Sequence, residues 1–152
     1  MMTQITEMIW LGDSHDALTA DLAKHEIKAI LNVAHDLQGE RGWSDGVEYA
    51  QVGLVDGPGN SLARYHAAVL QLAALVQGGR RTLVHCHKGQ SRSPAVIIMY
   101  LNLTQRMGWE HWRAFIAEKR KEVAEGEQYP HEAHRTAFNQ LNWRLLASVT
   151  EG

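Results

Sequence analysis

One stretch decides the fold of this chain: Val84-His85-Cys86-His87-Lys88-Gly89-Gln90-Ser91-Arg92-Ser93-Pro94. The residues before it, 81–84, have the short, β-branched character of a buried strand. The residues after it continue to Met107 with too many apolar side chains for a surface helix. A small-residue turn between a strand and a helix brings several backbone N–H groups and the positive end of the helix dipole to one point. The stretch therefore predicts an anion site with Cys86 at its mouth.

The side chains of this loop suit the chemistry of a phosphate group. Cys86 is the only cysteine, and a helix N-terminus with a nearby arginine favours the thiolate, the nucleophilic form of the side chain. Arg92 offers a planar guanidinium that can bind two phosphate oxygens at once. Gly89 allows the loop to turn back without a Cβ atom in the way, and Ser93 is placed to donate a hydrogen bond to the sulfur. A lone cysteine is more often a buried apolar side chain, but these neighbours favour catalysis.

The spacing of these residues resembles a known signature. A His-Cys pair at 85–86, followed after five residues by Arg92-Ser93, is similar to the signature of the cysteine-dependent protein tyrosine phosphatases. The run from Ser91 to Pro94 into an apolar helix resembles the dual-specificity branch, as does the opening of the chain up to Ala-Ile-Leu-Asn-Val at 29–33. The resemblance implies that Cys86 is the nucleophile and that Arg92 binds phosphate. The phosphate-binding loop is then made of His87, Lys88, Gly89, Gln90, Ser91 and Arg92.

Length and composition indicate a single domain. The chain has 152 residues, 45% of them hydrophobic, which is enough for one core, so we expect one phosphatase domain over residues 1–152. A net charge of −2 and a pI near 6.5 argue against general nucleic-acid binding or a membrane-surface role. The longest apolar run, around 94–103, is too short to span a bilayer. With no apparent signal peptide and a single cysteine, a reducing, cytoplasmic location is expected.

Strand and helix patterns alternate through most of the chain. Strands are predicted at 8–13, 27–33, 47–55 and 81–84, and helices after Asp13 or Ser14, at 61–77, at 95–107, at 109–123 and at 131–148, with a loop at 35–46 and a linker at 125–130. This alternation predicts an α/β fold with a central, mostly parallel sheet of about four or five strands flanked by helices, and with a helical C-terminal part. The catalytic loop is expected at the carboxyl end of a strand, where such sheets bind ligands.

The departing alkoxide or phenolate needs a proton, and the water that attacks later needs a base. Asp56 is the best candidate for both roles, because it follows the strand 47–55 in an Asp-Gly-Pro-Gly loop that could close over the site. The family's general acid lies at the same place, about thirty residues before the cysteine. The plain alternative is that Asp56 only forms a turn. Asp36 and Asp45 are the other candidates for the acid.

Histidines flank the cysteine, and His85 is expected to orient the loop and to help hold the thiolate. A zinc site is not expected, because Cys86 on an extended chain points away from His85 and His87, and no second ligand pair has zinc-like spacing. No metal and no organic cofactor are therefore predicted. Lys88 either adds positive potential at the mouth or is simply solvated.

The C-terminal part carries two further features. The basic run at 119–121 is interpreted as a solvated helix end, which the helix dipole favours. Pro130-His131 stands where the family commonly has Pro-Asn before its last helix. No role of that asparagine is carried over to His131.

The predicted function is phosphomonoester hydrolysis through a phosphocysteine, with Cys86, Arg92, Asp56, Ser93 and His85 as the catalytic residues. The expected substrate is a phosphorylated protein, with dual specificity for Tyr and Ser/Thr, and a phosphate, vanadate or sulfate ion is expected to bind in the loop. Phosphoinositide or RNA 5′-phosphatase activity is the alternative for the substrate. A rhodanese-type sulfurtransferase is a rival enzyme, and a phosphate-binding pseudophosphatase or adaptor is the rival from another class.

Overall fold

The computed structural model describes residues 1–37, 46–124 and 129–151. Its described part contains a five-stranded sheet in the order β1-β2-β5-β3-β4. The strands are β1 (Thr3–Gln4), β2 (Ile9–Gly12), β3 (Ala29–Ala34), β4 (Glu48–Leu54) and β5 (Thr82–His85). β2, β5, β3 and β4 pair in parallel, while β1 lies antiparallel on β2. The α/β fold with a mostly parallel sheet is thus confirmed, and the short edge strand β1 is an addition to the predicted strands.

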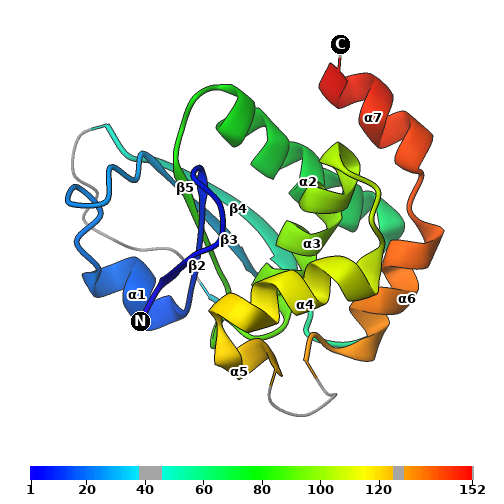
Figure 1. Cartoon of the computed structure of the whole chain (residues 1–152), viewed down its shortest axis with the longest axis horizontal. Coiled ribbons are helices and arrows are strands. Elements are labelled where there is room, and N and C mark those ends of the chain that lie inside the picture. Colours follow the sequence, from blue (N-terminus) through cyan, green and yellow to red (C-terminus); the bar gives the residue numbers. More distant parts are fainter. Residues whose placement is uncertain (38–45, 125–128, 152) are drawn as a thin grey trace.

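Along the chain, helices follow β2 and β4, and five more come after the last strand, β5, in the described part (Figure 1). They are α1 (Ser14–Thr19), α2 (Leu62–Gln77), α3 (Arg92–Thr104), α4 (Trp109–Lys119), α5 (Lys121–Ala124), α6 (Glu132–Gln140) and α7 (Trp143–Glu151). The helix predicted at 95–107 begins three residues earlier, at Arg92, and ends three residues earlier, at Thr104, because Gln105 is extended. The single helix predicted at 131–148 is two helices, because Leu141 is extended and the side chain of Asn142 accepts a hydrogen bond from the N–H of Leu145.

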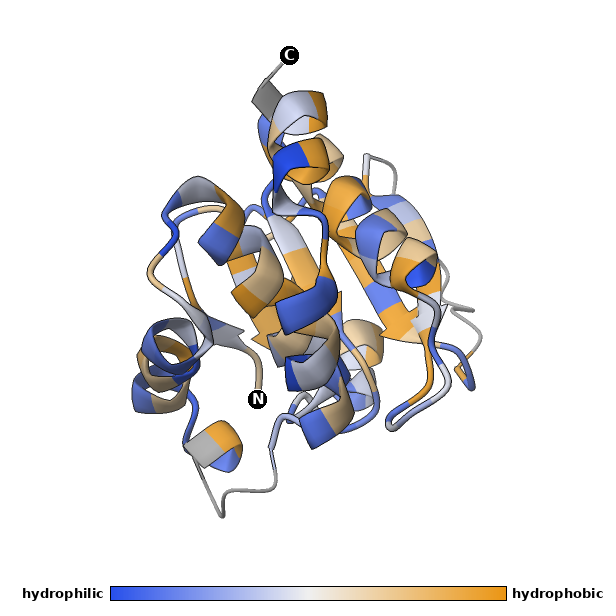
Figure 2. Cartoon of the chain, turned by 90° about the vertical axis from the view of Figure 1, so that its right-hand side faces the viewer, coloured by the Kyte–Doolittle hydropathy of each residue, from blue (hydrophilic) through white to orange (hydrophobic). Residues whose placement is uncertain are grey.

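Alternate residues of the central strands are buried on opposite faces of the sheet. Ile30 and Leu83 belong to a small cluster under α1, whereas Leu31 and Val84 belong to the main core. In Figure 1, α1 lies to one side of the sheet, and α2, α3 and α4 lie to the other. The helices carry alternating hydrophobic and hydrophilic stretches (Figure 2), as expected when only one side of a helix meets a core. Strands covered on both faces are typical of parallel sheets.

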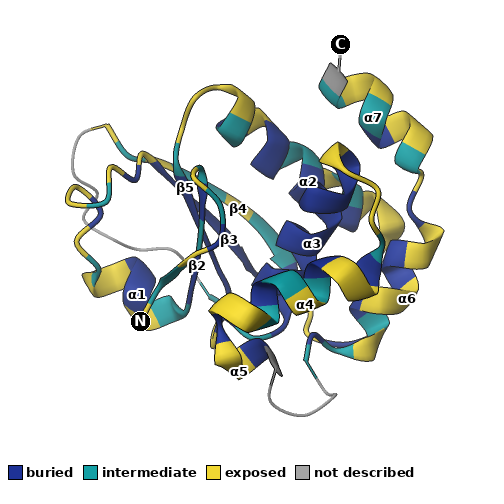
Figure 3. Ribbon diagram, in the orientation of Figure 1, coloured by how far each residue is buried: buried dark blue, intermediate teal, exposed yellow. Residues whose placement is uncertain are grey.

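Helix α3 runs through the middle of the main core. Every residue from Arg92 to Leu103 is buried, and the helix is dark over most of its length in Figure 3. Its apolar residues pack under α2 and α4, so the run that is too apolar for a surface helix belongs to a central one. This burial fixes the N-terminus of α3 rigidly against the end of β5.

The carboxyl ends of the parallel strands lie at one edge of the sheet. Asp13 follows β2, Asp36 follows β3, Asp56 follows β4 and Cys86 follows β5. Sheets of this kind bind ligands at that edge. Four chain segments that are far apart in sequence therefore meet where the catalytic loop was predicted.

Candidate active site

The segment from Cys86 to Ser91 forms the loop between β5 and α3. Gly89 turns it with φ of +66°, a backbone conformation that favours glycine. A Cβ atom at Gly89 would lie 2.6 Å from the carbonyl oxygen of Gly12 and 2.8 Å from a guanidinium nitrogen of Arg120. The carbonyl of His87 accepts a hydrogen bond of 2.9 Å from the N–H of Ser14. The loop is thus packed tightly against the end of β2.

Cys86 is almost fully buried, with 2% of its surface exposed. Its Sγ lies 3.1 Å from the hydroxyl oxygen of Ser93, in the first turn of α3. His85 Nδ1 lies 3.1 Å from the carbonyl oxygen of Cys86, and burial lowers the pKa of His85 below its usual value. A neutral His85 can donate from Nδ1 to that carbonyl. Ser93 and His85 therefore contact the cysteine on its side chain and on its backbone.

The guanidinium of Arg92 is held from one side only. Its Nη1 donates to Asp36 Oδ1 at 2.9 Å and to the carbonyl of Leu54 at 3.0 Å. Nε is buried, and no described residue accepts a hydrogen bond from it. A buried donor without a partner is rare in a folded protein. The edge of the guanidinium that carries Nε is therefore available to a ligand.

Asp36 lies beside this arginine. Its carboxylate accepts from Arg92 and lies 3.3 Å from Nε2 of His87. Burial works to raise the pKa of Asp36, but the hydrogen bond and positive charge of Arg92 prevail and hold that pKa below the usual value. Asp36, one of the alternative candidates for the acid, thus orients the arginine. Asp45, the other alternative, lies outside the described residues.

Asp56 accepts two hydrogen bonds on one oxygen. Ser91 Oγ donates to Oδ1 at 2.6 Å, and His134 Nε2 lies 3.0 Å from the same atom. Partial burial raises the pKa of the carboxyl, but the hydrogen bonds from His134 and Ser91, with the charge of Arg92, outweigh this effect and lower the pKa to about 2. The carboxylate of Asp56 is therefore held by side chains from two other segments of the chain.

A cavity of about 230 Å³ brings these groups together. Its walls are Asp56, Cys86, His87, Lys88, Gln90, Ser91, Arg92 and Tyr129. The described walls thus combine the expected nucleophile, arginine and acid with most of the predicted phosphate-binding loop. Gly89, Ser93 and His85 do not line this cavity. They support the loop through the contacts described above. Tyr129 is a wall that the sequence patterns did not suggest.

Ser91 occupies the N-cap position of α3 but does not cap it. Its hydroxyl donates to Asp56 and accepts a hydrogen bond of 2.9 Å from the N–H of His131. The first N–H groups of a helix have no partner within the helix. Because Ser91 uses its hydroxyl on Asp56, these N–H groups remain available to an anion at the cavity.

Three more contributors to the site, besides Tyr129, escaped the sequence reasoning. His134 contacts Asp56, and His131 Nδ1 caps α6 by accepting from the N–H of Ala133 at 3.0 Å. Arg120 is 4% exposed, which contradicts the interpretation of the run 119–121 as wholly solvated. Its Nε donates to the carbonyl of Gly89 at 2.9 Å, so it supports the loop from behind. Arg120 is the extended residue directly after the end of α4, so helical spacing does not indicate that it faces inward.

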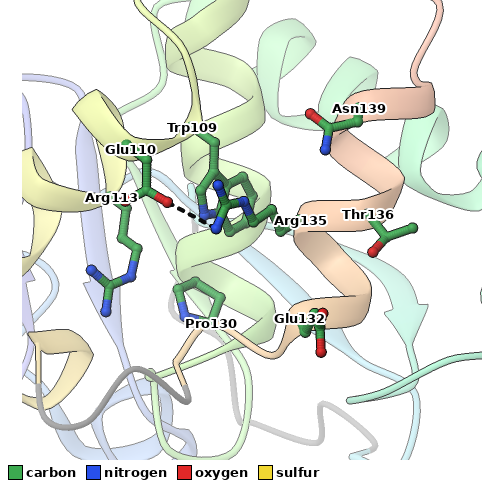
Figure 4. A pocket seen from close by; sticks show the side chains of 8 residues that line it. All are labelled: Trp109, Glu110, Arg113, Pro130, Glu132, Arg135, Thr136 and Asn139. Atoms are coloured by element: carbon green, nitrogen blue, oxygen red, sulfur yellow. Dashed lines mark ion pairs between the residues drawn. The ribbon is translucent and has the colours of Figure 1, made fainter.

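A larger cavity of about 630 Å³ lies beside the site, between α4 and α6 (Figure 4). An ion pair of 3.0 Å joins Glu110 to Arg135 across it. The two cavities adjoin at two consecutive residues: Tyr129 lines the smaller cavity, and Pro130 lines the larger one. None of its walls comes from the catalytic loop, so the smaller cavity is the candidate active site.

Among the described residues, no helix has the length and apolar character needed to cross a membrane.

A cysteine at the mouth of a strand-to-helix anion loop, with an arginine in the same loop and an aspartate on a neighbouring one, defines the cysteine-dependent phosphatase class of site. Residues 9–134 match the family "Dual specificity phosphatase, catalytic domain", and the chain belongs to this family. It is 32% identical over 111 residues to dual specificity protein phosphatase 22 of mouse and human, an alignment that covers 72% of this chain and 59% of those proteins. It is 28% identical over 122 residues to the Drosophila melanogaster phosphatase Mpk3, covering 79% of this chain and 30% of that protein.

Solved structures show the same fold. The structure of DUSP15 superposes with a TM-score of 0.83 at 20% identity, covering 99% of this chain and 94% of that chain. A mouse putative dual specificity phosphatase complexed with zinc tungstate superposes with a TM-score of 0.79 at 23% identity, covering 98% of this chain and 91% of that chain. The fold described above is therefore shared with these solved structures.

Proposed function

We propose that this chain hydrolyses phosphomonoesters through a phosphocysteine on Cys86, with phosphotyrosine and phosphoserine or phosphothreonine in proteins as its substrates. One observation carries the proposal. The buried Nε of Arg92 has no acceptor among the described residues, and it belongs to a residue that lines the same cavity as Cys86. A phosphoryl group on Cys86 would give that donor its missing partner.

In the first step the sulfur of Cys86 attacks phosphorus. The S–P bond forms while the bond from phosphorus to the leaving oxygen breaks, and Asp56 transfers its proton to that oxygen. Arg92 and the loop N–H groups stabilise the charge on the remaining phosphoryl oxygens. The hydroxyl of Ser93, 3.1 Å from Sγ, donates to the thiolate before attack.

In the second step water attacks the phosphocysteine. Asp56, now a carboxylate, takes a proton from the water as the new O–P bond forms and the S–P bond breaks. The electron pair of that bond returns to sulfur, where the Ser93 hydroxyl again donates to the thiolate. The products are inorganic phosphate and the original enzyme with its acid protonated, so no metal or organic cofactor takes part.

Asp56 has to be protonated for the first step, although its own surroundings lower its pKa to about 2. A bound phosphoryl group brings negative charge next to the carboxyl, and like charge raises a carboxyl pKa. Substrate binding therefore favours the protonated acid. Activity on esters with poor leaving groups should accordingly be highest at mildly acidic pH.

The choice of a protein substrate rests on the walls of the cavity. Lys88 is the one lysine among its described walls, whereas a highly charged phosphoinositide or an RNA end calls for a more basic surface. The mouse putative phosphatase that was solved in complex with zinc tungstate supports a second expectation. By analogy with it, the loop of this chain should bind a tetrahedral oxyanion such as phosphate, vanadate or sulfate.

Hydrolysis of p-nitrophenyl phosphate, with and without vanadate, tests the reaction class. We expect turnover that vanadate inhibits competitively, and Cys86→Ser as the matched inactive control. A phosphotyrosyl and a phosphothreonyl peptide of the same sequence, compared with a phosphoinositide and a 5′-phosphorylated RNA, then test the substrate class. Absence of vanadate-sensitive turnover on every one of these substrates contradicts the proposal and favours the adaptor.

A further inference from the structure

His134 is the most deeply buried ionisable group beside the site. Its exposed fraction is 0%, and it lies near the start of α6, where its N–H donates to the carbonyl of His131 at 3.0 Å. Its ring joins two elements, with Nε2 3.0 Å from Asp56 Oδ1 and Nδ1 2.7 Å from the hydroxyl of Tyr65 on α2. A buried polar ring bonded at both nitrogens is held in one orientation.

The direction of each bond in this chain follows from the donors available. Asn60 Nδ2 donates to the hydroxyl oxygen of Tyr65 at 3.2 Å. Burial raises the pKa of Tyr65, so the hydroxyl keeps its proton, and among the described residues only His134 Nδ1 is placed to accept it. A histidine that accepts at Nδ1 carries its own proton on Nε2. His134 is therefore a donor to Asp56.

Asn60 also fixes the loop that carries the acid. Its Oδ1 accepts from the N–H of Val55 and its Nδ2 donates to the carbonyl of Val55, both at 2.8 Å. The chain of bonds thus begins on the backbone immediately before Asp56 and returns to the Asp56 carboxylate through Tyr65 and His134.

Two donors converge on one oxygen of Asp56. Ser91 accepts from the N–H of His131, so its single proton is free to go to Oδ1 of Asp56 at 2.6 Å. His134 donates to the same Oδ1. In the described part of the chain, no donor reaches Oδ2 within hydrogen-bonding distance. The two oxygens of the acid are therefore unequal before any substrate arrives.

We propose that His134 is a positioning residue for the reaction: together with Ser91 it holds Oδ1 of Asp56, so that Oδ2 is the oxygen that gives the proton to the leaving group. This inference rests on the proposed function. In the first step the Oδ2–H bond breaks as the leaving oxygen gains the proton and separates from phosphorus. In the second step Oδ2 takes a proton from the attacking water. His134 itself neither gains nor loses a proton in either step.

The arrangement also affects the pH dependence. The titratable and charged groups around Asp56 come from several elements: His134 on α6, His131 at the N-cap of α6, Tyr65 on α2, Arg92 on α3, and Cys86, His87, Lys88 and Tyr129 around the cavity. A donor to the carboxylate stabilises its charged form. Removal of the His134 donor therefore raises the pKa of Asp56, and the alkaline limb of kcat, which needs the protonated acid, moves to higher pH.

The test compares His134→Phe with His134→Gln on two esters. Phenylalanine keeps the ring volume without a donor, and glutamine keeps a donor near the place of Nε2. The substrates are a phosphotyrosyl peptide and 6,8-difluoro-4-methylumbelliferyl phosphate, whose leaving group is a much weaker base. We expect His134→Phe to lose about 10- to 100-fold in kcat on the peptide, as for a misplaced catalytic group, and several-fold less on the activated ester. His134→Gln should recover most of that loss.

The ratio of the two kcat values does not depend on how much of the variant is folded. Tyr65→Phe, which removes only the far hydroxyl, should change the ratio in the same direction by a smaller factor. His66→Gln is the matched control, because His66 lies on α2 and, among the residues that the structure describes, accepts only from the N–H of Asn142 at 3.1 Å. Its ratio should equal that of the wild type.

Equal losses on both esters in His134→Phe and Tyr65→Phe, with an unmoved alkaline limb, overturn the positioning role and leave His134 as a core residue. The proposed function stands in that case, since the wild type still turns over. A wild type that hydrolyses neither ester overturns the proposed function itself, so the two failures are distinguishable.

Discussion

Arg92 and Asp36 form an ion pair of 2.9 Å in which the carboxylate takes only one edge of the guanidinium. Nη1 is bonded to Asp36 and to the carbonyl of Leu54, and the buried Nε is left without a described acceptor. The side chain of Arg92 is 7% exposed, so this geometry is fixed before a ligand binds. An arginine held in this way is preorganised to bind two oxygens of a phosphoryl group.

Arg92→Lys tests this two-point binding of a phosphoryl group by the planar guanidinium. Lysine keeps the charge but cannot bond Asp36 and two phosphoryl oxygens in one plane. We expect a loss on the order of a hundredfold or more in kcat/KM, similar to the loss of a preorganised oxyanion donor. Steady-state kinetics on p-nitrophenyl phosphate measures it, with Arg80→Lys, at an exposed arginine just after the end of α2, as the control. Near-normal kinetics would mean that Arg92 does not face the phosphate.

Cys86→Ser tests the nucleophile. An alkoxide is hardly available from serine at neutral pH, so turnover should fall almost to zero while phosphate-like ligands still bind. Titration calorimetry with a phosphotyrosyl peptide should show binding by the variant, and rapid quench of the wild type should trap radiolabelled phosphate on Cys86. A variant that keeps a tenth of the wild-type kcat would rule out the phosphocysteine.

Arg120→Met tests the support behind the loop. The change leaves the carbonyls of Gly89 and Leu11 and the hydroxyl of Thr3 without their buried donor. Each lost bond to a charged group contributes about 1.5–3 kcal/mol, so Tm should fall clearly and kcat should fall with it. Lys119→Met and Lys121→Met, at the exposed neighbours, should leave both values unchanged. An equally stable Arg120→Met would show that these contacts do not support the loop.

Most of the fold could be predicted because its signals are local. The alternating strands and helices, the cap of α2 at Ser61 and the glycine stop at Gly78 each depend on residues within a few positions. The errors have local causes too. β1 contains two residues, too few for any period, and the break between α6 and α7 depends on one extended residue, Leu141, inside a continuous apolar pattern.

The residues of the candidate site also differ in whether local sequence signals predict them. Cys86, Arg92 and Ser93 follow from spacing within one segment, whereas His134 meets Asp56 from 78 positions away in the chain. Arg120 looks like its charged neighbours in the sequence, and only the packing of α4 against the loop buries it. Contacts of this kind depend on how elements pack, which a single sequence pattern does not specify.

Acid should weaken the fold through Asp56. Its folded pKa of about 2 lies below the value of about 3.9 in an unfolded chain. The carboxylate therefore stabilises the folded state fully above about pH 4, and this contribution is lost as pH falls toward 2. Asp36, whose pKa is also lowered, adds to the effect with the same sign. We expect the Tm difference between wild type and Asp56→Asn to be larger at pH 6 than at pH 3, as measured by circular dichroism. A gap that widens on acidification would contradict this sign.

Asp56→Asn tests the acid itself, through the leaving group. A phenolic oxygen, whose conjugate acid has a pKa of about 10, needs a proton to depart, as does the still more basic oxygen of an alkyl ester, and a leaving group several units more acidic needs it much less. The variant should therefore lose about a hundredfold or more in kcat on phosphotyrosine, and clearly less on an activated aryl ester. The alkaline limb of the kcat profile should flatten in the variant, because the group that has to stay protonated is gone. Asp36→Asn is the matched control: it disturbs Arg92 and should slow both esters by the same factor. If Asp56→Asn also slows both equally and keeps its alkaline limb, Asp56 only shapes its loop, and the proton comes from another group at the carboxyl edge of the sheet.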